Sequence, residues 1–264
     1  MKPAPFHYVA PGSLAKALEL VGDEARPLAG GQSLVPLLNF RLARPATLVD
    51  LNPLEDELAG MREGAGGVLR IGALTRQAAV ERSALVAERW PLLRAAVRHA
   101  GHPQIRSRGT VGGSVAHADP AAELPAALLA LDARFHVRSR RGERTLAAGE
   151  MFVGPLTTAL EPDELLVEIE VPPLPEGAGT AFTEHARTHG DFAIAGAAAV
   201  VAPGRAAIAV LGAGPAAVRA TDAERALADG ADAREAGELA GALVQEGPRR
   251  ALIAALVREA VEKA

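Results

Sequence analysis

The sequence of 264 residues contains no cysteine. This absence excludes disulfide bonds, zinc sites built from thiolates and iron–sulfur clusters ligated by this chain. Aromatic residues make up only 3% of the sequence, so alanine, leucine and valine must build most of the core. A basic excess is also missing, because the formal net charge is −4, and we therefore expect no nucleic-acid partner.

Long apolar segments are absent as well. No stretch reaches the length of a transmembrane helix without a charged or turn-forming residue, and the opening residues, MKPAPFHYVAPGS, lack the continuous apolar core of a signal peptide. We therefore expect a cytoplasmic protein with no transmembrane segment. The composition, with 49% hydrophobic and 23% charged residues, is typical of a globular protein large enough for roughly two domains.

The opening residues, up to about 55, are predicted to form a small β-α-β-like unit, which is followed by a second region over 56–175. In the first, a strand over 26–29 leads into a glycine-rich turn and a helix over 33–42. In the second, the stretch 101–120 has no clear periodicity, and long ordered loops of this kind tend to carry function. The other elements expected are a helix over 13–21 capped by Ser13, a helix over 75–81 capped by Thr75, helices over 88–100 and 121–131, a hairpin around 64–67, and strands over 46–51, 68–71, 133–139 and 165–171.

A proline- and glycine-rich segment, PPLPEGAG at 172–179, is the best candidate for a linker. Three apolar stretches after it predict strands, and three amphipathic stretches at the end predict helices. Strands followed by helices are typical of a separate α+β domain, so we expect residues 176–264 to form a three-stranded antiparallel sheet with helices. The strands are expected over 180–187, 194–202 and 206–211, and the helices over 223–229, 233–245 and 249–263.

The first of two glycine-rich segments spans 29–34 and has the sequence AGGQSL. Gly30 and Gly31 allow a sharp turn and leave no Cβ in the path of a ligand. Ser33 can cap the following helix, whose N-terminus would offer backbone N–H groups and a favourable dipole to an anion such as phosphate. The same residues also fit a plain tight turn between a strand and a helix.

The second segment, RGTVGGSVAHADP at 108–120, interleaves three glycines with Thr110 and Ser114. The glycines permit close backbone approach and the hydroxyls can donate to phosphate oxygens, while Asp119 or Glu123 can accept a hydrogen bond from a ribose hydroxyl. A bulged strand followed by a helix-capping aspartate is the alternative. Two such loops far apart in sequence suit a dinucleotide, and neither is a P-loop because no Gly-Lys-Ser/Thr follows.

Other patterns resemble known sites less closely. The stretch LGAGPAA at 211–217 matches a Rossmann fingerprint, but Pro215 removes an N–H that such a helix would need, and no second strand with a terminal acidic residue follows. The histidines near the second loop match no standard metal-ligand spacing, so we expect no metal site. In the C-terminal part, Gly190 and Asp191 predict a turn that is followed by Phe192, which can stack on a flat cofactor ring or belong to the core.

Together these segments resemble the flavoprotein, or medium, subunit of the xanthine dehydrogenase and carbon monoxide dehydrogenase family of molybdenum hydroxylases. The resemblance implies an α+β fold with a vanillyl-alcohol-oxidase-type (PCMH-type) FAD-binding domain over 1–175 and a C-terminal α+β domain over 176–264. The FAD-binding domain would consist of two α/β subdomains, about 1–55 and 56–175. It runs in order along nearly the whole chain. Its stretches are PLAGGQSLVPLLNFRLARPATLVDLN (27–52), QIRSRGTVGGSVAHADPAAELP (104–125), LEPDELLVEIEVP (160–172) and HARTHGDFAIAG (185–196).

The resemblance implies roles for single residues around an FAD cofactor. Both glycine-rich loops would wrap its pyrophosphate, and Glu123, which is aspartate in many relatives, would contact the adenosine part. Leu166 or Val167 would line the flavin pocket, and Phe192 would lie against the flavin ring. The complete set of implied FAD-binding residues is Ala29, Gly30, Gly31, Gln32, Ser33, Leu34, His102, Ile105, Thr110, Gly112, Gly113, Ser114, Asp119, Glu123, Leu166, Val167, Asp191 and Phe192.

The resemblance also implies a function and partners. Hydroxylation would occur at molybdenum in a molybdopterin-binding large subunit, and electrons would pass through 2Fe–2S clusters of a small subunit to FAD in this chain, as part of a dimer of heterotrimers. Some members carry lysine near Thr183 or Glu184, and its lack here leaves the electron acceptor open. No catalytic acid or base is expected in this chain. The alternatives are a scaffold subunit that has lost its flavin and a stand-alone flavin oxidase.

Overall fold

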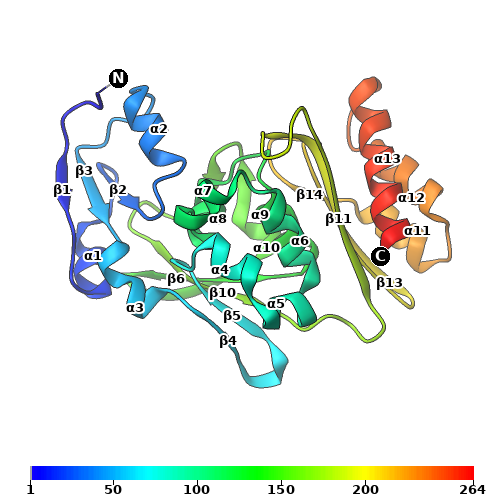
Figure 1. Cartoon of the computed structure of the whole chain (residues 1–264), viewed down its shortest axis with the longest axis horizontal. Helices are drawn as coiled ribbons and strands as arrows, with labels where there is room; N and C mark the ends of the chain where they lie inside the picture. The colour runs from blue at the N-terminus through cyan, green and yellow to red at the C-terminus, as the bar shows by residue number, and fades with distance from the viewer. Residues whose placement is uncertain (1) are drawn as a thin grey trace.

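The computed structural model describes residues 2–264, which form three parts in a row along the longest axis of the molecule (Figure 1). The N-terminal part is a parallel three-stranded sheet in the order β1-β3-β2. Ser13 caps its first helix as predicted, because its hydroxyl accepts a hydrogen bond from the Lys16 N–H at 3.3 Å. The elements are β1 (His7–Val9), α1 (Leu14–Leu20), β2 (Ala25–Leu28), α2 (Leu34–Asn39), β3 (Thr47–Asp50), η1 (Asn52–Leu54) and α3 (Glu55–Leu58).

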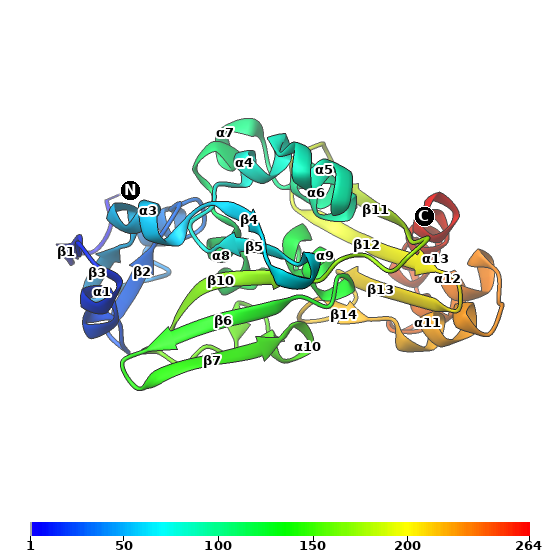
Figure 2. The ribbon, with the colours of Figure 1, turned by 90° about the horizontal axis from the view of Figure 1, so that it is seen from below.

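The middle part is an antiparallel sheet in the order β4-β5-β10-β6-β7, with helices on one side of it (Figure 2). Its strands are β4 (Met61–Glu63), β5 (Leu69–Gly72), β6 (Arg134–Ser139), β7 (Gly142–Ala147) and β10 (Leu165–Val171). The helices are η2 (Ala65–Gly67), α4 (Gln77–Arg82), α5 (Ala84–Arg89), α6 (Pro91–His99), α7 (Pro103–Arg108), α8 (Val111–His117), α9 (Glu123–Ala130) and α10 (Ala148–Met151). A small ribbon, β8 (Phe152–Gly154) and β9 (Thr157–Thr158), completes it.

The C-terminal part is an antiparallel sheet covered on both faces. Along β12, Ala195, Ala197 and Ala199 face a core shared with α13, whereas Ala198 and Val200 face the core of the middle part. This alternation follows from the period of two in a strand, and it explains why the sequence here is apolar without interruption. The elements are β11 (Gly179–Ala186), β12 (Ala193–Ala202), β13 (Arg205–Leu211), β14 (Val218–Arg219), α11 (Thr221–Ala228), α12 (Ala233–Gly241) and α13 (Pro248–Lys263).

The three strands predicted for this sheet are present, and the short β14 adds a fourth in the order β11-β12-β13-β14. The segment that was weighed as a Rossmann loop leads from β13 into β14 without an intervening helix, as expected from Pro215. Across residues 2–264, no helix is both long and apolar enough to cross a membrane.

Three local predictions were wrong. Thr75 does not cap a helix: its buried hydroxyl exchanges hydrogen bonds with the N–H and C=O of Gly60. The helix predicted over 88–100 is two helices separated at Trp90. The stretch 101–120 is largely helical, in α7 and α8, which are six and seven residues long and therefore too short to show periodicity in a glycine-rich sequence.

Candidate cofactor site

The two glycine-rich loops lie in direct contact, although they are far apart in the sequence. A Cβ atom on Gly30 would lie 2.3 Å from the carbonyl oxygen of Arg108 and 2.8 Å from the Cα of Gly109. Real Cβ atoms do not approach backbone this closely, so only glycine fits at position 30. A Cβ on Gly113 would lie 3.8 Å from the Cβ of Ala29, so the second loop also faces the first.

A chain of hydrogen bonds holds the two loops together. Asn52 donates from Nδ2 to the carbonyl oxygen of Ala29 at 3.0 Å, and its Oδ1 accepts from Nη2 of Arg76 at 2.8 Å. Arg76 also donates from Nη1 to the carbonyl oxygen of Arg108 at 2.8 Å. One half-buried guanidinium therefore fixes the spacing of both loops through charge-assisted bonds. Neither Asn52 nor Arg76 was predicted, and only the asparagine directly after a strand offered a sequence signal.

The first loop carries the free backbone donors. In the described part of the chain, no protein acceptor receives the N–H groups of Gly31, Gln32, Ser33 and Leu34. Gly31 has a φ of +74°, which favours glycine, and its carbonyl accepts from Val35 at 3.0 Å to begin α2. Ser33 has helical backbone angles and its side chain makes no cap, so the prediction of a Ser33 cap is wrong. Free N–H groups at the start of a helix suit an anion.

The second loop is the N-terminus of α8, which rules out the bulged-strand alternative. The buried Thr110 accepts a hydrogen bond from the N–H of Gly113 at 3.1 Å. Gly112 packs against the backbone of Ala73, whose carbonyl would lie 2.7 Å from a Cβ at position 112. The first N–H groups of α8 thus already have partners, while Gly113 and Ser114 remain half-buried at the loop surface.

The acidic residues after this loop differ in their surroundings. Asp119 closes a turn by accepting from the N–H of Ala121 at 2.9 Å. Glu123 is the first residue of α9 and is only 7% exposed. Burial raises the pKa of Glu123 to about 7, and the negative charge of Glu184 acts in the same direction. Glu123 is therefore partly protonated near neutral pH, unlike an ordinary glutamate.

The turn between β11 and β12 lies on the start of α7. A Cβ on Gly190 would be 2.6 Å from the ring of His102, so the turn and this histidine are in contact. Asp191 accepts from the N–H of Phe192 at 2.9 Å, and the Phe192 side chain is 72% exposed, which excludes the core alternative. Ile105 is 39% exposed. An aromatic and an aliphatic side chain are thus free to contact a flat ring.

Leu166 and Val167 lie in β10. Leu166 is buried in the core of the middle part, whereas Val167 is half-buried. The carbonyl of Val167 accepts from the N–H of Ala73 at 2.9 Å, and Ala73 in turn packs on Gly112. Val167 is thus connected to the loop through a single intervening residue, and Leu166 contributes mainly to packing.

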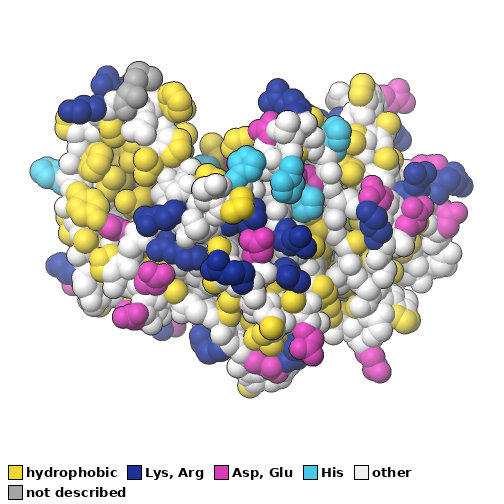
Figure 3. Space-filling view, in the orientation of Figure 1, with side chains coloured by type: hydrophobic (Ala, Val, Ile, Leu, Met, Phe, Trp, Pro, Cys, Tyr) yellow, Lys and Arg dark blue, Asp and Glu magenta, His cyan; other side chains and the backbone are white. Residues whose placement is uncertain are grey.

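The molecular surface has a notch, and positively charged side chains lie close to it on the same face. Figure 3 shows a notch between the part that contains α2 and the part that contains α7 and β11, with lysine and arginine side chains gathered near it. Histidine side chains gather between α7 and β11. Among the described residues, no group of three or more histidine, aspartate or glutamate side chains is arranged so that it could hold a metal ion.

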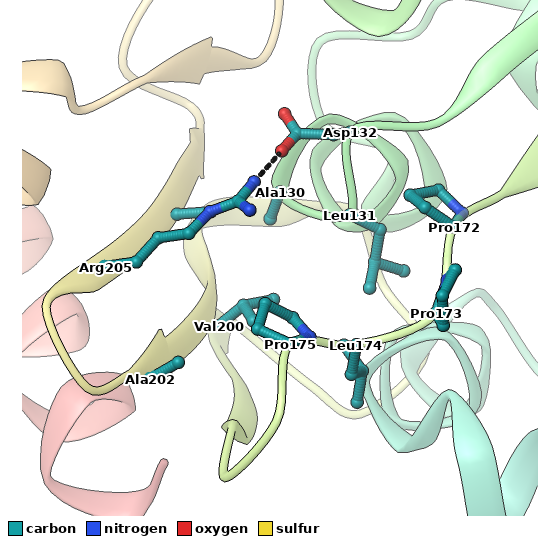
Figure 4. A pocket seen from close by; sticks show the side chains of 11 residues that line it. Ala130, Leu131, Asp132, Pro172, Pro173, Leu174, Pro175, Val200, Ala202 and Arg205 are labelled. Atoms are coloured by element: carbon teal, nitrogen blue, oxygen red, sulfur yellow. Dashed lines mark hydrogen bonds and ion pairs between the residues drawn. The ribbon is translucent and has the colours of Figure 1, made fainter.

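A separate small pocket lies under the linker and is no candidate for the cofactor. It is lined by prolines 172, 173 and 175 and by apolar residues at the end of α9 and in β12 and β13 (Figure 4). Its polar lining is the ion pair of Arg205 and Asp132, at 2.9 Å. The pocket is far too small for a dinucleotide, and both charged groups in it are already paired.

Comparisons with known proteins agree with this geometry. The family described as the FAD binding domain in molybdopterin dehydrogenase matches residues 4–174. The 6-hydroxypseudooxynicotine dehydrogenase complex subunit alpha of Paenarthrobacter nicotinovorans is 48% identical over 238 residues, or 87% of this chain and 80% of that protein. The carbon monoxide dehydrogenase medium chain of Hydrogenophaga pseudoflava is 41% identical over 204 residues, or 76% of this chain and 70% of that protein.

Solved structures extend the similarity over the whole chain. A chain of reconstituted CO dehydrogenase from Oligotropha carboxidovorans superposes with a TM-score of 0.92 at 35% identity, covering 100% of this chain and 99% of that one. A chain of quinoline 2-oxidoreductase from Pseudomonas putida 86 superposes with a TM-score of 0.91 at 36% identity, covering 100% and 98%. The predicted α+β fold class is confirmed.

Proposed function

Because the chain belongs to the family of FAD-binding domains in molybdopterin dehydrogenases and has FAD as its cofactor, we propose that it is the electron-transfer subunit of a molybdenum hydroxylase. Its relatives are subunits of dehydrogenase complexes, which makes this chain an oxidoreductase component. In the proposed route, electrons reach FAD from 2Fe–2S clusters of a partner and leave to an external acceptor. The contact between the two glycine-rich loops is the observation that supports this proposal most strongly.

The residues present fit an FAD pyrophosphate. Gly113 is half-buried where the second loop faces the first, and the unpaired N–H groups of 31–34 supply donors for an anion. Ser114 adds a hydroxyl at the second loop. When bound, FAD supplies two-electron chemistry that can be passed on in single steps. The protein's task is to bind and orient it.

We propose that the ends of the cofactor are divided between the acidic segment and the C-terminal turn. Asp119 and Glu123 would face the adenosine half, and Phe192, with Ile105 and His102 beside it, would face the flavin ring. The remaining proposed contacts are Ala29, Gly30, Gly31, Gln32, Ser33, Leu34, Thr110, Gly112, Gly113, Ser114, Leu166, Val167 and Asp191. Of these, Gly30, Thr110, Gly112 and Leu166 would act by shaping the loops rather than by touching FAD, since all four are buried.

We propose two domains, 1–175 and 176–264, and two kinds of partner. The chain has no cysteine to ligate a 2Fe–2S cluster, so the clusters must belong to a small subunit, and molybdopterin to a large one. A dimer of such heterotrimers in the cytoplasm is the assembly we expect. A stand-alone oxidase is disfavoured because both faces of the C-terminal sheet are covered, which leaves no room there for a substrate pocket.

Reconstitution tests the function. The purified chain, alone and together with its partner subunits, is expected to hold close to one FAD per chain, measured from flavin absorbance and by identifying the released cofactor. Reduction of that FAD by the substrate of the assembled complex, observed as bleaching of the flavin band, would support the electron route. A chain that takes up no FAD even with its partners present would instead be a flavin-free scaffold.

A further inference from the structure

The buried side chain of Arg106 joins helix α7 to helix α4, which packs beside it (Figure 2). Arg106 is only 6% exposed, although it carries a charge. Its guanidinium donates from Nε to Oε2 of Glu81 at 2.8 Å and from Nη2 to Oε1 at 3.2 Å. Charged side chains are rarely buried to this degree without a partner. The two parallel bonds to one carboxylate therefore fix α7 on α4 in a defined orientation.

The third nitrogen of the same guanidinium leads to the turn that carries Phe192. Nη1 of Arg106 donates to the carbonyl oxygen of Gly101 at 2.8 Å, two residues before α7 begins. A Cβ on Gly190 would lie 3.2 Å from that carbonyl oxygen, so the β11–β12 turn packs against it. Only Asp191 separates Gly190 from Phe192. An unbroken series of contacts thus runs from Arg106 through Gly101 to the turn.

The other end of α7 is held at the two glycine-rich loops. The carbonyl oxygen of Arg108 accepts from Arg76 at 2.8 Å, and that of Gly109 accepts from the N–H of Gln77 at 2.9 Å. Gly30 packs on Arg108 and Gly109. Helix α7 has only six residues, and helices this short have little stability of their own. The spacing between the loops and the turn therefore depends on the side chains that hold this helix.

We propose that Arg106 is a positioning residue for the flavin: it holds the β11–β12 turn at a fixed place relative to the glycine-rich loops, so that Phe192 meets the flavin ring when the loops hold the pyrophosphate. The inference rests on the function proposed above. All three guanidinium nitrogens already have protein partners, Glu81 and Gly101. The influence of Arg106 on the flavin must therefore pass through the turn.

A double-mutant cycle tests this role in the full chain loaded with FAD, together with its partner subunits. Arg106→Lys keeps the charge but replaces the rigid fork with one ammonium group, which cannot hold both partners in the same geometry. It is expected to shift the visible absorption and the reduction potential of the flavin in the same direction as Phe192→Ala. The double variant should match Phe192→Ala alone, because the arginine acts on the flavin through this ring.

A purely structural role predicts a different result. Arg106→Lys would then lower the FAD content, while the FAD that remains would keep the wild-type spectrum and potential. Glu81→Gln provides a milder change, because it leaves an acceptor for Arg106 and removes only the negative charge. This variant is expected to shift the flavin signals in the same direction by a smaller amount.

Arg219→Lys is the matched control. Arg219 also donates from two nitrogens to one carboxylate, that of Glu224, and from the third to a backbone carbonyl, that of Leu129 at 3.2 Å. It lies in β14, at the edge of the C-terminal sheet. The control is expected to leave the flavin spectrum and the reduction potential at their wild-type values.

Hydrogen exchange of the FAD-free chain gives a readout that needs no cofactor. In Arg106→Lys, the amides of residues 187–192 are expected to exchange about tenfold faster than in wild type, because a charge-assisted bond to the carbonyl that supports the turn is lost. Arg219→Lys should leave the exchange of this segment unchanged.

Two results would overturn the positioning role. One is wild-type exchange of residues 187–192 in Arg106→Lys, and the other is an effect of Arg106→Lys on the flavin that simply adds to that of Phe192→Ala. Failure of the wild-type chain to bind FAD under any condition would instead overturn the proposed function, and hydrogen exchange would still show whether Arg106 holds the turn.

Discussion

Arg76 and Asn52 join the two glycine-rich loops: Nη2 of the arginine donates to Oδ1 of the asparagine at 2.8 Å. Each residue also holds the backbone of one loop, through the carbonyl oxygens of Arg108 and Ala29. The arginine thus links the two segments that we propose to bind the same ligand. Its contribution lies in fixing their spacing before the cofactor arrives, which lowers the ordering cost of binding.

We expect Arg76→Gln to weaken FAD binding by roughly tenfold or more, because hydrogen bonds to charged groups contribute about 1.5–3 kcal/mol each. Fluorescence titration of the deflavinated chain measures the dissociation constant. Arg62→Gln is the control, since Arg62 pairs with Glu168 on the five-stranded sheet. Unchanged affinity in Arg76→Gln would mean that the loops do not need this brace.

Gly113→Ala is expected to reduce the FAD content of the purified chain severely. The new Cβ would lie 3.8 Å from the Cβ of Ala29 in the first loop and 2.6 Å from Oγ1 of Thr110, so alanine already disturbs the Thr110 cap of α8. Gly149→Ala serves as control, because nothing lies within 4 Å of a Cβ at position 149. Full FAD content in Gly113→Ala would show that the pyrophosphate lies elsewhere.

Phe192→Ala should leave stability within about 0.5 kcal/mol, because the side chain is 72% exposed. It should nevertheless shift the visible absorption and the reduction potential of bound FAD, since a stacked aromatic ring tunes the flavin. Phe40→Ala removes an aromatic that is 65% exposed in the N-terminal part and provides the comparison. Identical flavin spectra in the two variants would contradict stacking by Phe192.

The ion pair of Arg144 and Glu164 predicts acid sensitivity. Two contacts of 2.7 Å join the guanidinium to the carboxylate, and this hydrogen bonding lowers the pKa of Glu164 below its ordinary value of 4.5. The stabilisation is therefore fully present above pH 4.5 and is lost as pH falls through the lowered pKa of the folded state. Urea denaturation of Glu164→Gln should show lower stability at pH 7 than wild type.

The difference between Glu164→Gln and wild type should shrink below pH 4, where the native carboxyl also becomes neutral. Glu161→Gln, which changes an exposed residue of the same loop, should follow the wild-type pH profile more closely. A constant difference at all pH values would indicate that packing, rather than charge, accounts for the loss.

The sequence by itself determined the parts of this protein that depend on local chemistry. Serine before an amphipathic stretch predicted the cap at Ser13, and period-two patterns located most strands, because these features depend on neighbours along the chain. The paired glycine-rich loops, with the resemblance they carry, indicated an FAD-binding protein. Composition alone excluded iron–sulfur ligation by this chain, because thiolates are needed for it.

The tertiary structure decided how those parts cooperate. It showed that Gly30 packs on Gly109, that Arg76 is hydrogen-bonded to Asn52 and to the backbone of the second loop, and that Gly112 packs on Ala73. It also brought Glu184 beside His99 and buried Glu123 at the start of α9. No sequence pattern encodes these contacts, because clash, burial and charge coupling depend on distances between residues that are remote in the chain.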